Sequence, residues 1–187
     1  MRILIFLSGV IAVVLIACSS SAPIPTKQPA VTSTPIPFRG LWLATQPVVD
    51  AITDEETVKL FNTAVSGQSE GGGAIYLGIE CVPPTAMVEI VWKSFIGGNW
   101  RPAEVTWRLD SEDAISGEWS LDSVGDKVSL SEGEAESFVS DMLRHDQLIA
   151  RVTSYSGNKL TATFDVRGLE EAIKPLYEGC PGLSPIN

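Results

Sequence analysis

The chain has 187 residues, and its 13 Lys and Arg residues are outnumbered by 23 Asp and Glu residues, which gives a formal net charge of −10. Two of the basic residues and none of the acidic ones precede residue 38, so residues 38–187 combine 11 basic with 23 acidic side chains and carry a net charge of −12. A surface this acidic repels nucleic acid and anionic lipid, so we expect no nucleic-acid partner.

The first 17 residues are typical of a secretory signal peptide. Arg2 precedes an apolar run from Ile3 to Ala17, which is shorter than the roughly 20 residues that a membrane span needs. The run ends in Leu-Ile-Ala-Cys, the pattern of a bacterial lipobox, in which a peptidase cuts before an acylated cysteine. We therefore predict a lipoprotein signal peptide over 1–17 and lipidation at Cys18. An ordinary signal peptide or a short anchor is the alternative.

Residues 18–37 are predicted to be a tether that starts at the lipidated cysteine. The segment is rich in Pro, Ser and Thr, has one charge at Lys27, and shows no apolar period. Such a segment cannot bury enough apolar surface to fold by itself. A proline-rich ligand or an O-glycosylated stalk is the alternative function of this stretch.

Residues 38–187 are predicted to form a single β-rich globular domain, because a segment of this length can bury one hydrophobic core. Apolar and polar residues alternate with period two in short segments, which predicts strands. These segments are 57–64, 74–81, 87–95, 103–109, 118–121, 127–130, 148–155 and 160–165.

Two segments show helical spacing instead. Ser131 and Glu134 predict a capping box at the start of a helix, and the apolar stripe of this helix consists of Ala135, Phe138, Val139, Met142 and Leu143. A second helix is predicted over 169–176, and Pro175 means that it is short or kinked. The predicted fold class is α+β, mainly β: an antiparallel β-sandwich-like domain with one clear helix and one short C-terminal helix.

Two cysteines remain once Cys18 is assigned to the lipid. Cys81 and Cys180 form an even pair in a domain predicted to lie outside the cytoplasm, which favours a disulfide. Neither belongs to a CxxC motif, and no histidine stands near them, so a redox or zinc site is not expected.

The order of these segments resembles the type VI secretion-associated VasI/TagO group of bacterial envelope proteins. The matching pieces cover nearly all of residues 40–180: Trp42 with its Asp-containing loop, AIYLGIEC, MVEIVW, VTWRLD, EWSL, SFVSDMLRHD, LIARVTSY, LTATFDVRGLEEAIKPL and Cys180. The resemblance implies an extracytoplasmic β-rich domain without known catalysis.

The sequence predicts no catalytic residue. His145 is the single histidine and precedes Asp146, but no nucleophile motif such as GxSxG accompanies the pair, which favours a surface histidine. The acidic clusters at 54–56, 112–113 and 132–136 lack the ligand spacing of an EF-hand, so we predict no metal site and no cofactor. Two carboxylates that flank a cleft, as in glycosidases, are the alternative.

A candidate binding patch consists of charged residues in or beside apolar strands: Arg108, Asp110, Arg151, Asp165 and Arg167. Strand alternation can place such residues outward, where they form structural ion pairs. They can also form a polar patch that binds a ligand or partner, since a strand places a charge inward only where a partner group awaits it.

Together these features predict an extracytoplasmic lipoprotein anchored by its lipid to a bacterial membrane. Its predicted role is a non-catalytic binding or accessory module of the cell envelope, secretion-associated if the resemblance holds, with an unidentified envelope protein as partner. An envelope hydrolase that uses paired carboxylates is the alternative.

Overall fold

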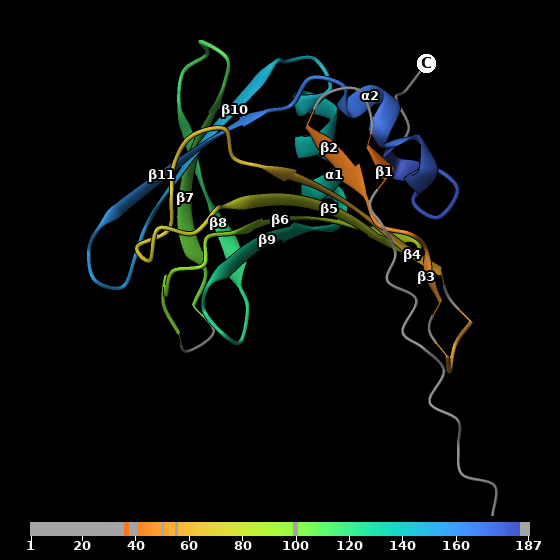
Figure 1. Cartoon of the computed structure of the whole chain (residues 1–187), viewed down its shortest axis with the longest axis horizontal. Helices are drawn as coiled ribbons and strands as arrows, with labels where there is room; N and C mark the ends of the chain where they lie inside the picture. The colour runs from red at the N-terminus through yellow and green to blue at the C-terminus, as the bar shows by residue number, and fades with distance from the viewer. Residues whose placement is uncertain (1–35, 38–40, 50, 55, 99–100, 184–187) are drawn as a thin grey trace, which may run out of the picture. The chain divides into compact units, whose positions relative to one another are not determined.

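The computed structural model describes residues 36–37, 41–49, 51–54, 56–98 and 101–183 (Figure 1). The predicted signal peptide (1–17), the lipidation site Cys18 and the tether (18–37), apart from residues 36 and 37, lie outside the described residues. None of the described helices combines the length and the apolar character needed to cross a membrane.

The described part of the chain is mainly β, as the alternating segments predict. The strands are β1 (Ile36–Pro37), β2 (Trp42–Ala44), β3 (Val48–Val49), β4 (Glu56–Thr63), β5 (Tyr76–Val82), β6 (Thr85–Val91), β7 (Ala103–Leu109), β8 (Ile115–Leu121), β9 (Lys127–Ser131), β10 (Gln147–Thr153) and β11 (Lys159–Asp165). The helices are α1 (Glu132–Met142), α2 (Leu169–Ala172) and the 3-10 turns η1 (Lys174–Leu176) and η2 (Pro181–Leu183).

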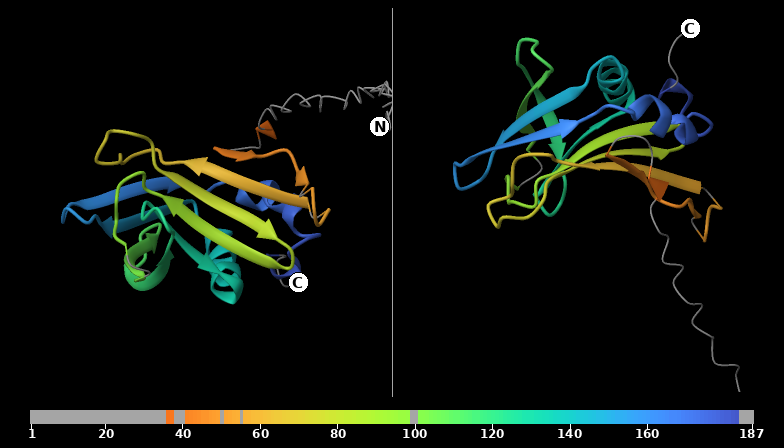
Figure 2. Two further views of the ribbon diagram at one scale, coloured as in Figure 1. Left: turned by 90° about the horizontal axis from the view of Figure 1, so that it is seen from below. Right: turned by 45° about the horizontal axis from the view of Figure 1, so that its top comes forward.

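All strand pairs are antiparallel, and the sheet order is β1-β2-β4-β5-β6-β9-β8-β7-β10-β11, with β3 paired to β4. The sheet bends at β8, whose residues 115–119 pair with β7 and whose Ser120 and Leu121 pair with β9. The hairpin of β10 and β11 crosses the strands of the other half in both views of Figure 2. The two facing layers of the predicted sandwich-like domain are thus formed by one continuous sheet.

The hairpin of β10 and β11 returns to the chain that follows β4. Ser66 forms an isolated bridge with Thr163, and the N–H of Val65 donates to the Thr163 carbonyl over 2.8 Å. The buried amide of Asn62 donates to the Asp165 carbonyl over 2.7 Å. The backbone groups of Thr163 and Asp165 on the edge of β11 that faces away from β10 are therefore hydrogen-bonded to β4 and to the chain that follows it.

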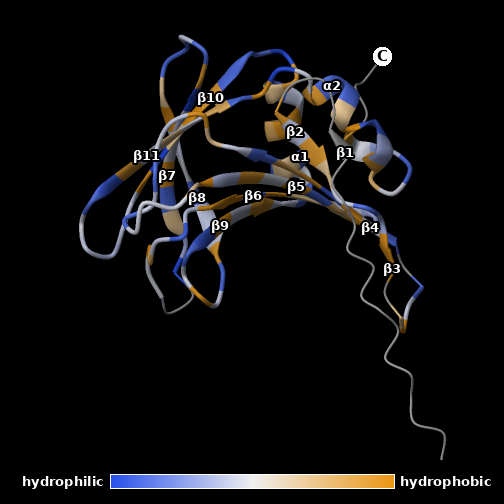
Figure 3. Ribbon diagram, viewed as in Figure 1, coloured by the Kyte–Doolittle hydropathy of each residue, from blue (hydrophilic) through white to orange (hydrophobic). Residues whose placement is uncertain are grey.

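Apolar side chains from both halves and from α1 form one core. Polar and apolar residues alternate along the strands in Figure 3, as expected for strands with one buried face. Helix α1 packs against β6 and β9. The ring of Phe138 meets Trp107 of β7 and Trp119 of β8 edge-on, with centroid distances of 5.7 and 5.3 Å, and the two tryptophan rings lie 5.9 Å apart. This aromatic cluster holds the bend of the sheet over the helix.

The predicted capping box at the start of α1 is wrong. Ser131 makes no side-chain hydrogen bond to the helix, because it is the last residue of β9 and its extended backbone is paired with Met87. The chain enters the helix through Glu132, whose φ is 55°. Strand pairing therefore overrides the local capping signal.

Cys81 of β5 and Cys180, which lies between the two 3-10 turns, form the predicted disulfide, with their Cα atoms 5.9 Å apart. Both cysteines are buried. The bond attaches the C-terminal segment, including the short predicted helix α2, to the middle of the domain. A strand and a C-terminal segment 99 positions apart in the chain are thus fixed side by side.

Candidate functional site

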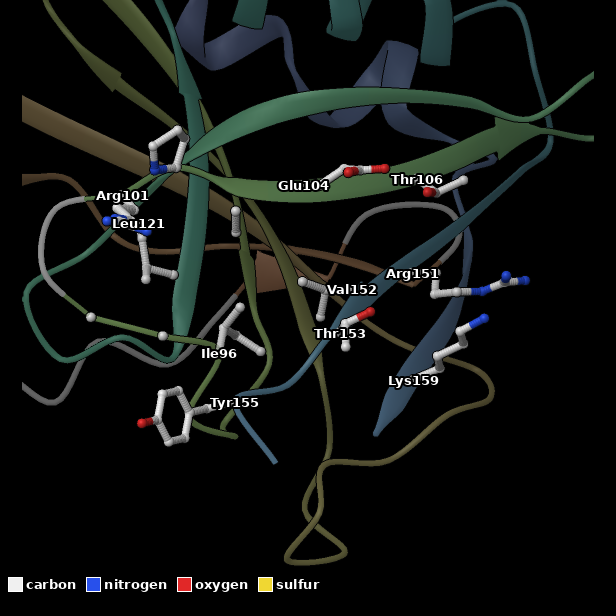
Figure 4. A pocket seen from close by; sticks show the side chains of 14 residues that line it. Ile96, Arg101, Glu104, Thr106, Leu121, Arg151, Val152, Thr153, Tyr155 and Lys159 are labelled. Atoms are coloured by element: carbon white, nitrogen blue, oxygen red, sulfur yellow. The ribbon is translucent and has the colours of Figure 1, made fainter. Parts of the chain in front are cut away.

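A groove of about 740 Å³ lies along the outer face of β7 and β10 (Figure 4). We call it the basic groove. The residues that define its chemistry are Arg101, Glu104, Thr106, Arg151, Tyr155 and Lys159. Three smaller hollows, next to the disulfide, next to His145 and next to Glu89, measure about 200 to 210 Å³ each.

Strand register places most of these side chains. Thr106 of β7 is paired with Arg151 of β10, and alternation puts Glu104 on the same face of β7. Lys159 begins β11 opposite Thr153, so it lies diagonally across from Arg151 on that face. Figure 4 shows Arg151 and Lys159 extending alongside each other, with Arg101 on the opposite side of the groove.

The turn between β10 and β11 is fixed by Glu70, which lies in the loop between β4 and β5. Its carboxylate accepts hydrogen bonds from Ser154 over 2.7 Å, from Asn158 over 2.8 Å and from Ser156. These bonds, that of Ser156 first, lower the pKa of Glu70. Because this turn carries Tyr155, the Glu70 contact holds an exposed aromatic ring at the end of the groove.

The aromatic ring at this end is well exposed. Tyr155 has 76% of its surface accessible, and its ring lies 5.2 Å from that of Phe95, which is itself 48% exposed. The Tyr155 N–H donates to the Phe95 carbonyl over 2.9 Å, so the two rings are tied through the backbone. The two adjacent rings form an exposed apolar patch, and contiguous apolar patches are a feature of surfaces that contact other molecules.

The cations of the basic groove differ from the other cations in their pairing. Of the ten Lys and Arg residues that the structure describes, five form ion pairs: Lys59, Lys127, Arg144, Arg167 and Lys174. The five without an ion pair to a described carboxylate are Lys93, Arg101, Arg108, Arg151 and Lys159. Three of these five line the basic groove.

The five residues of the predicted patch do not form one cluster. Arg151 lies in the basic groove, where it also donates to the Thr161 hydroxyl over 3.3 Å. Arg108 lies on the same face of β7 and lines the smaller hollow next to His145. Asp165 and Arg167 form a local ion pair, and the hydrogen bond from Arg167 lowers the pKa of Asp165.

Asp110, the fifth residue of the patch, connects two turns. Its carboxylate accepts from the N–H of Gln147 over 2.9 Å and lies 3.0 Å from Nδ1 of His145. The His145 contact, followed by the hydrogen bonds from the backbone N–H groups of Gln147 and Asp146, lowers the pKa of Asp110. His145 also approaches Glu112, with 3.6 Å between Nε2 and the carboxylate, so its partners are Asp110 and Glu112 rather than the neighbouring Asp146. These bonds join the turn after β7 to the start of β10.

A separate polar cluster lies on the outer face of β4, β5, β6 and β9. Glu89 is 2% exposed, contacts Lys59, and lies 2.9 Å from Lys127. Burial raises the pKa of Glu89, but hydrogen bonds and charges from the two lysines outweigh it and hold the pKa below its ordinary value. Gly78 leaves the room that this carboxylate occupies, because a Cβ there would stand 2.8 Å from Glu89 Cγ. The charges compensate one another, which gives the cluster a structural role.

Sequence reasoning missed Arg101, Glu104, Tyr155 and Lys159. Strand alternation could have placed Glu104 and Lys159 on an outer face, but only the pairing of β10 with both β7 and β11 brings them together. Among the described residues, no group of three or more metal-ligating side chains is positioned to hold a metal ion.

No protein-family model matches the chain, and no curated protein sequence matches it. The resemblance to the VasI/TagO group therefore has no support from either comparison. Among solved structures, the chain is similar to the crystal structure of invasion associated protein B from Bartonella henselae, with a TM-score of 0.52 and 12% sequence identity. The match covers 78% of this chain and 97% of that one. At this identity the likeness shows a shared fold.

Proposed function

We propose that this protein is a non-catalytic binding module of the bacterial cell envelope, tethered by a lipid at Cys18, and that the basic groove is its binding surface. The observation that carries the proposal is the gathering of Arg101, Arg151 and Lys159, none with an ion pair to a described carboxylate, in a domain with a net charge of −12. In such a domain carboxylates are abundant, so unpaired cations that share a groove leave their charge available to a ligand.

Two further observations support a binding role. The groove is formed by paired strands and by a turn held by Glu70. The backbone that carries its polar groups is therefore ordered before a ligand arrives, which lowers the entropy cost of binding. The solved structure of similar fold is described as invasion associated, a description that names no catalysed reaction. A secretion-associated partner stays a prediction.

The test is a capture experiment with envelope extract from the source bacterium. The purified full chain is immobilised beside an Arg151→Glu/Lys159→Glu variant, which reverses two exposed charges of the groove. Arg108→Glu is the matched control, because Arg108 is an exposed cation that also has no ion pair to a described carboxylate, and it lies on the same face of β7 but outside the groove. Material retained by the native chain and the control, but lost with the groove variant, is the expected result. Equal retention by all three would contradict the proposal.

A second candidate function, hydrolysis by paired carboxylates, has one observation in its favour. Glu104 in the groove is directly opposite Glu118 on β8, and both side chains are exposed. Directly opposed like charges destabilise a strand pair, so this pair has no structural benefit. The hydrolase candidate requires turnover of an envelope polymer that is lost in both Glu104→Gln and Glu118→Gln. Binding without turnover supports the module instead.

A further inference from the structure

We infer that the basic groove binds an extended acidic polysaccharide, a chain of sugars that carry carboxylate or phosphate groups at intervals. This inference rests on the proposed function and specifies its ligand. The first argument is charge: Arg101, Arg151 and Lys159 form no ion pair with a described carboxylate, and Glu104 is the single carboxylate residue among the described residues that line the groove. The guanidinium of Arg151 has five N–H donors, and one bond to Thr161 leaves others free for an anion.

The spacing of the cations favours an extended ligand over a compact one. Arg151 and Lys159 extend together at one side of the groove, and Arg101 stands at the other side, with Glu104 and Thr106 on β7 between them (Figure 4). A single phosphate or carboxylate would be surrounded by converging donors, as in a compact anion site. Cations at two separate sides fit a chain whose anionic groups are spaced along its length.

The lining between the cations favours sugar over acidic peptide. Thr106 has a hydroxyl group, which shares one hydrogen bond of 2.8 Å with Ser116 and can accept another. The carboxylate of Glu104 accepts hydrogen bonds from hydroxyl groups, which every sugar of a polysaccharide presents and the side chains of an acidic peptide lack. The exposed ring of Tyr155 offers an apolar face at the end of the groove, on which the C–H face of a sugar ring can pack.

The experiment is a calorimetric titration of the full chain with three probes at low salt. The first probe is a galacturonic acid oligomer, the second is the same oligomer with its carboxylates methyl-esterified, and the third is poly-glutamate of similar length. We expect the acidic oligomer to bind, with affinity that falls as salt rises, and the neutral ester to bind at least tenfold more weakly. Arg151→Gln and Lys159→Gln should each weaken the acidic oligomer about three- to tenfold, whereas Arg108→Gln should leave its affinity unchanged.

Each contrary outcome has a definite meaning. Equal binding of the acid and the ester, or an equal loss in Arg108→Gln, would overturn charge recognition in the groove. Tighter binding of poly-glutamate would overturn the sugar assignment in favour of an acidic protein. If no probe binds while the groove still captures envelope material, the ligand class is wrong and the proposed function stands. If both experiments fail, both proposals are refuted.

Discussion

Removing the disulfide is expected to cost several kilocalories per mole of stability. Cys81 and Cys180 are separated by 99 positions, and a loop of about 100 residues is worth about 4.7 kcal/mol in the chain-entropy model of cross-linking. We expect the measured loss to lie at or below this figure, because native cross-links commonly contribute about 2 to 5 kcal/mol. For a domain of this size, a loss of 4 kcal/mol lowers the midpoint of thermal unfolding by roughly 8 to 16 °C.

The assay is urea unfolding of the oxidised chain and of a Cys81→Ala/Cys180→Ala variant, both in a Cys18→Ser background that removes the third thiol. Both cysteines are buried, so the alanine variant also loses packing. The control is therefore the same chain with its disulfide chemically reduced, because this chain keeps both sulfur atoms and loses only the cross-link. A loss below about 1 kcal/mol in the reduced chain would refute the loop-closure reasoning.

Three further predictions concern stability. Trp119→Ala should destabilise the domain by about 3 to 5 kcal/mol, measured by urea unfolding, because the ring is fully buried against Phe138. Hydrogen bonds, that of Ser156 first, lower the pKa of Glu70 in the folded state, so the Glu70 carboxylate binds a proton more tightly in the unfolded state. The hydrogen bonds of the Glu70 carboxylate therefore stabilise the fold fully above its ordinary pKa of 4.5, and this stabilisation is lost as pH falls through the lowered pKa. Glu70→Gln should make the free energy of unfolding less dependent on pH in this acidic range. Gly67→Ala should destabilise by more than about 1 kcal/mol, because φ is +97° and a Cβ would stand 2.2 Å from the Thr161 carbonyl; an unchanged unfolding midpoint would contradict this.

The sequence was most informative where period-two alternation is long. The hairpin of β10 and β11, from Gln147 to Asp165, matches its pattern nearly residue for residue. Short or polar segments were predicted less well. The strand predicted at 118–121 is the second half of β8, whose start at Ile115 was missed, and β3, a pair of exposed valines paired with β4, was not predicted. These segments form strands because neighbouring strands supply their hydrogen-bond partners, and the local sequence pattern contains no information on those partners.

The candidate site was less predictable than the fold. Strand alternation placed Arg108 and Arg151 on an outer face, and both do lie there. The contact of Asp110 with His145 joins residues 35 positions apart and has no local signal. The same holds for Arg101, which precedes β7, and Lys159, which begins β11: they share one groove only because β10 pairs with β7 on one side and with β11 on the other.

The strand order also sets a sequence of events for a chain that emerges from its N-terminus. Strands β4, β5 and β6 can pair with one another as soon as they are made, but the free edge of β6 is completed only by β9, which follows β7 and β8 in the chain. The bridge from Ser66 to Thr163 must wait until almost the whole domain is present. Pairings this distant in the chain form slowly, and an unpaired edge invites association with other chains. We therefore expect the incomplete domain to be prone to association with other chains until its last hairpin is in place.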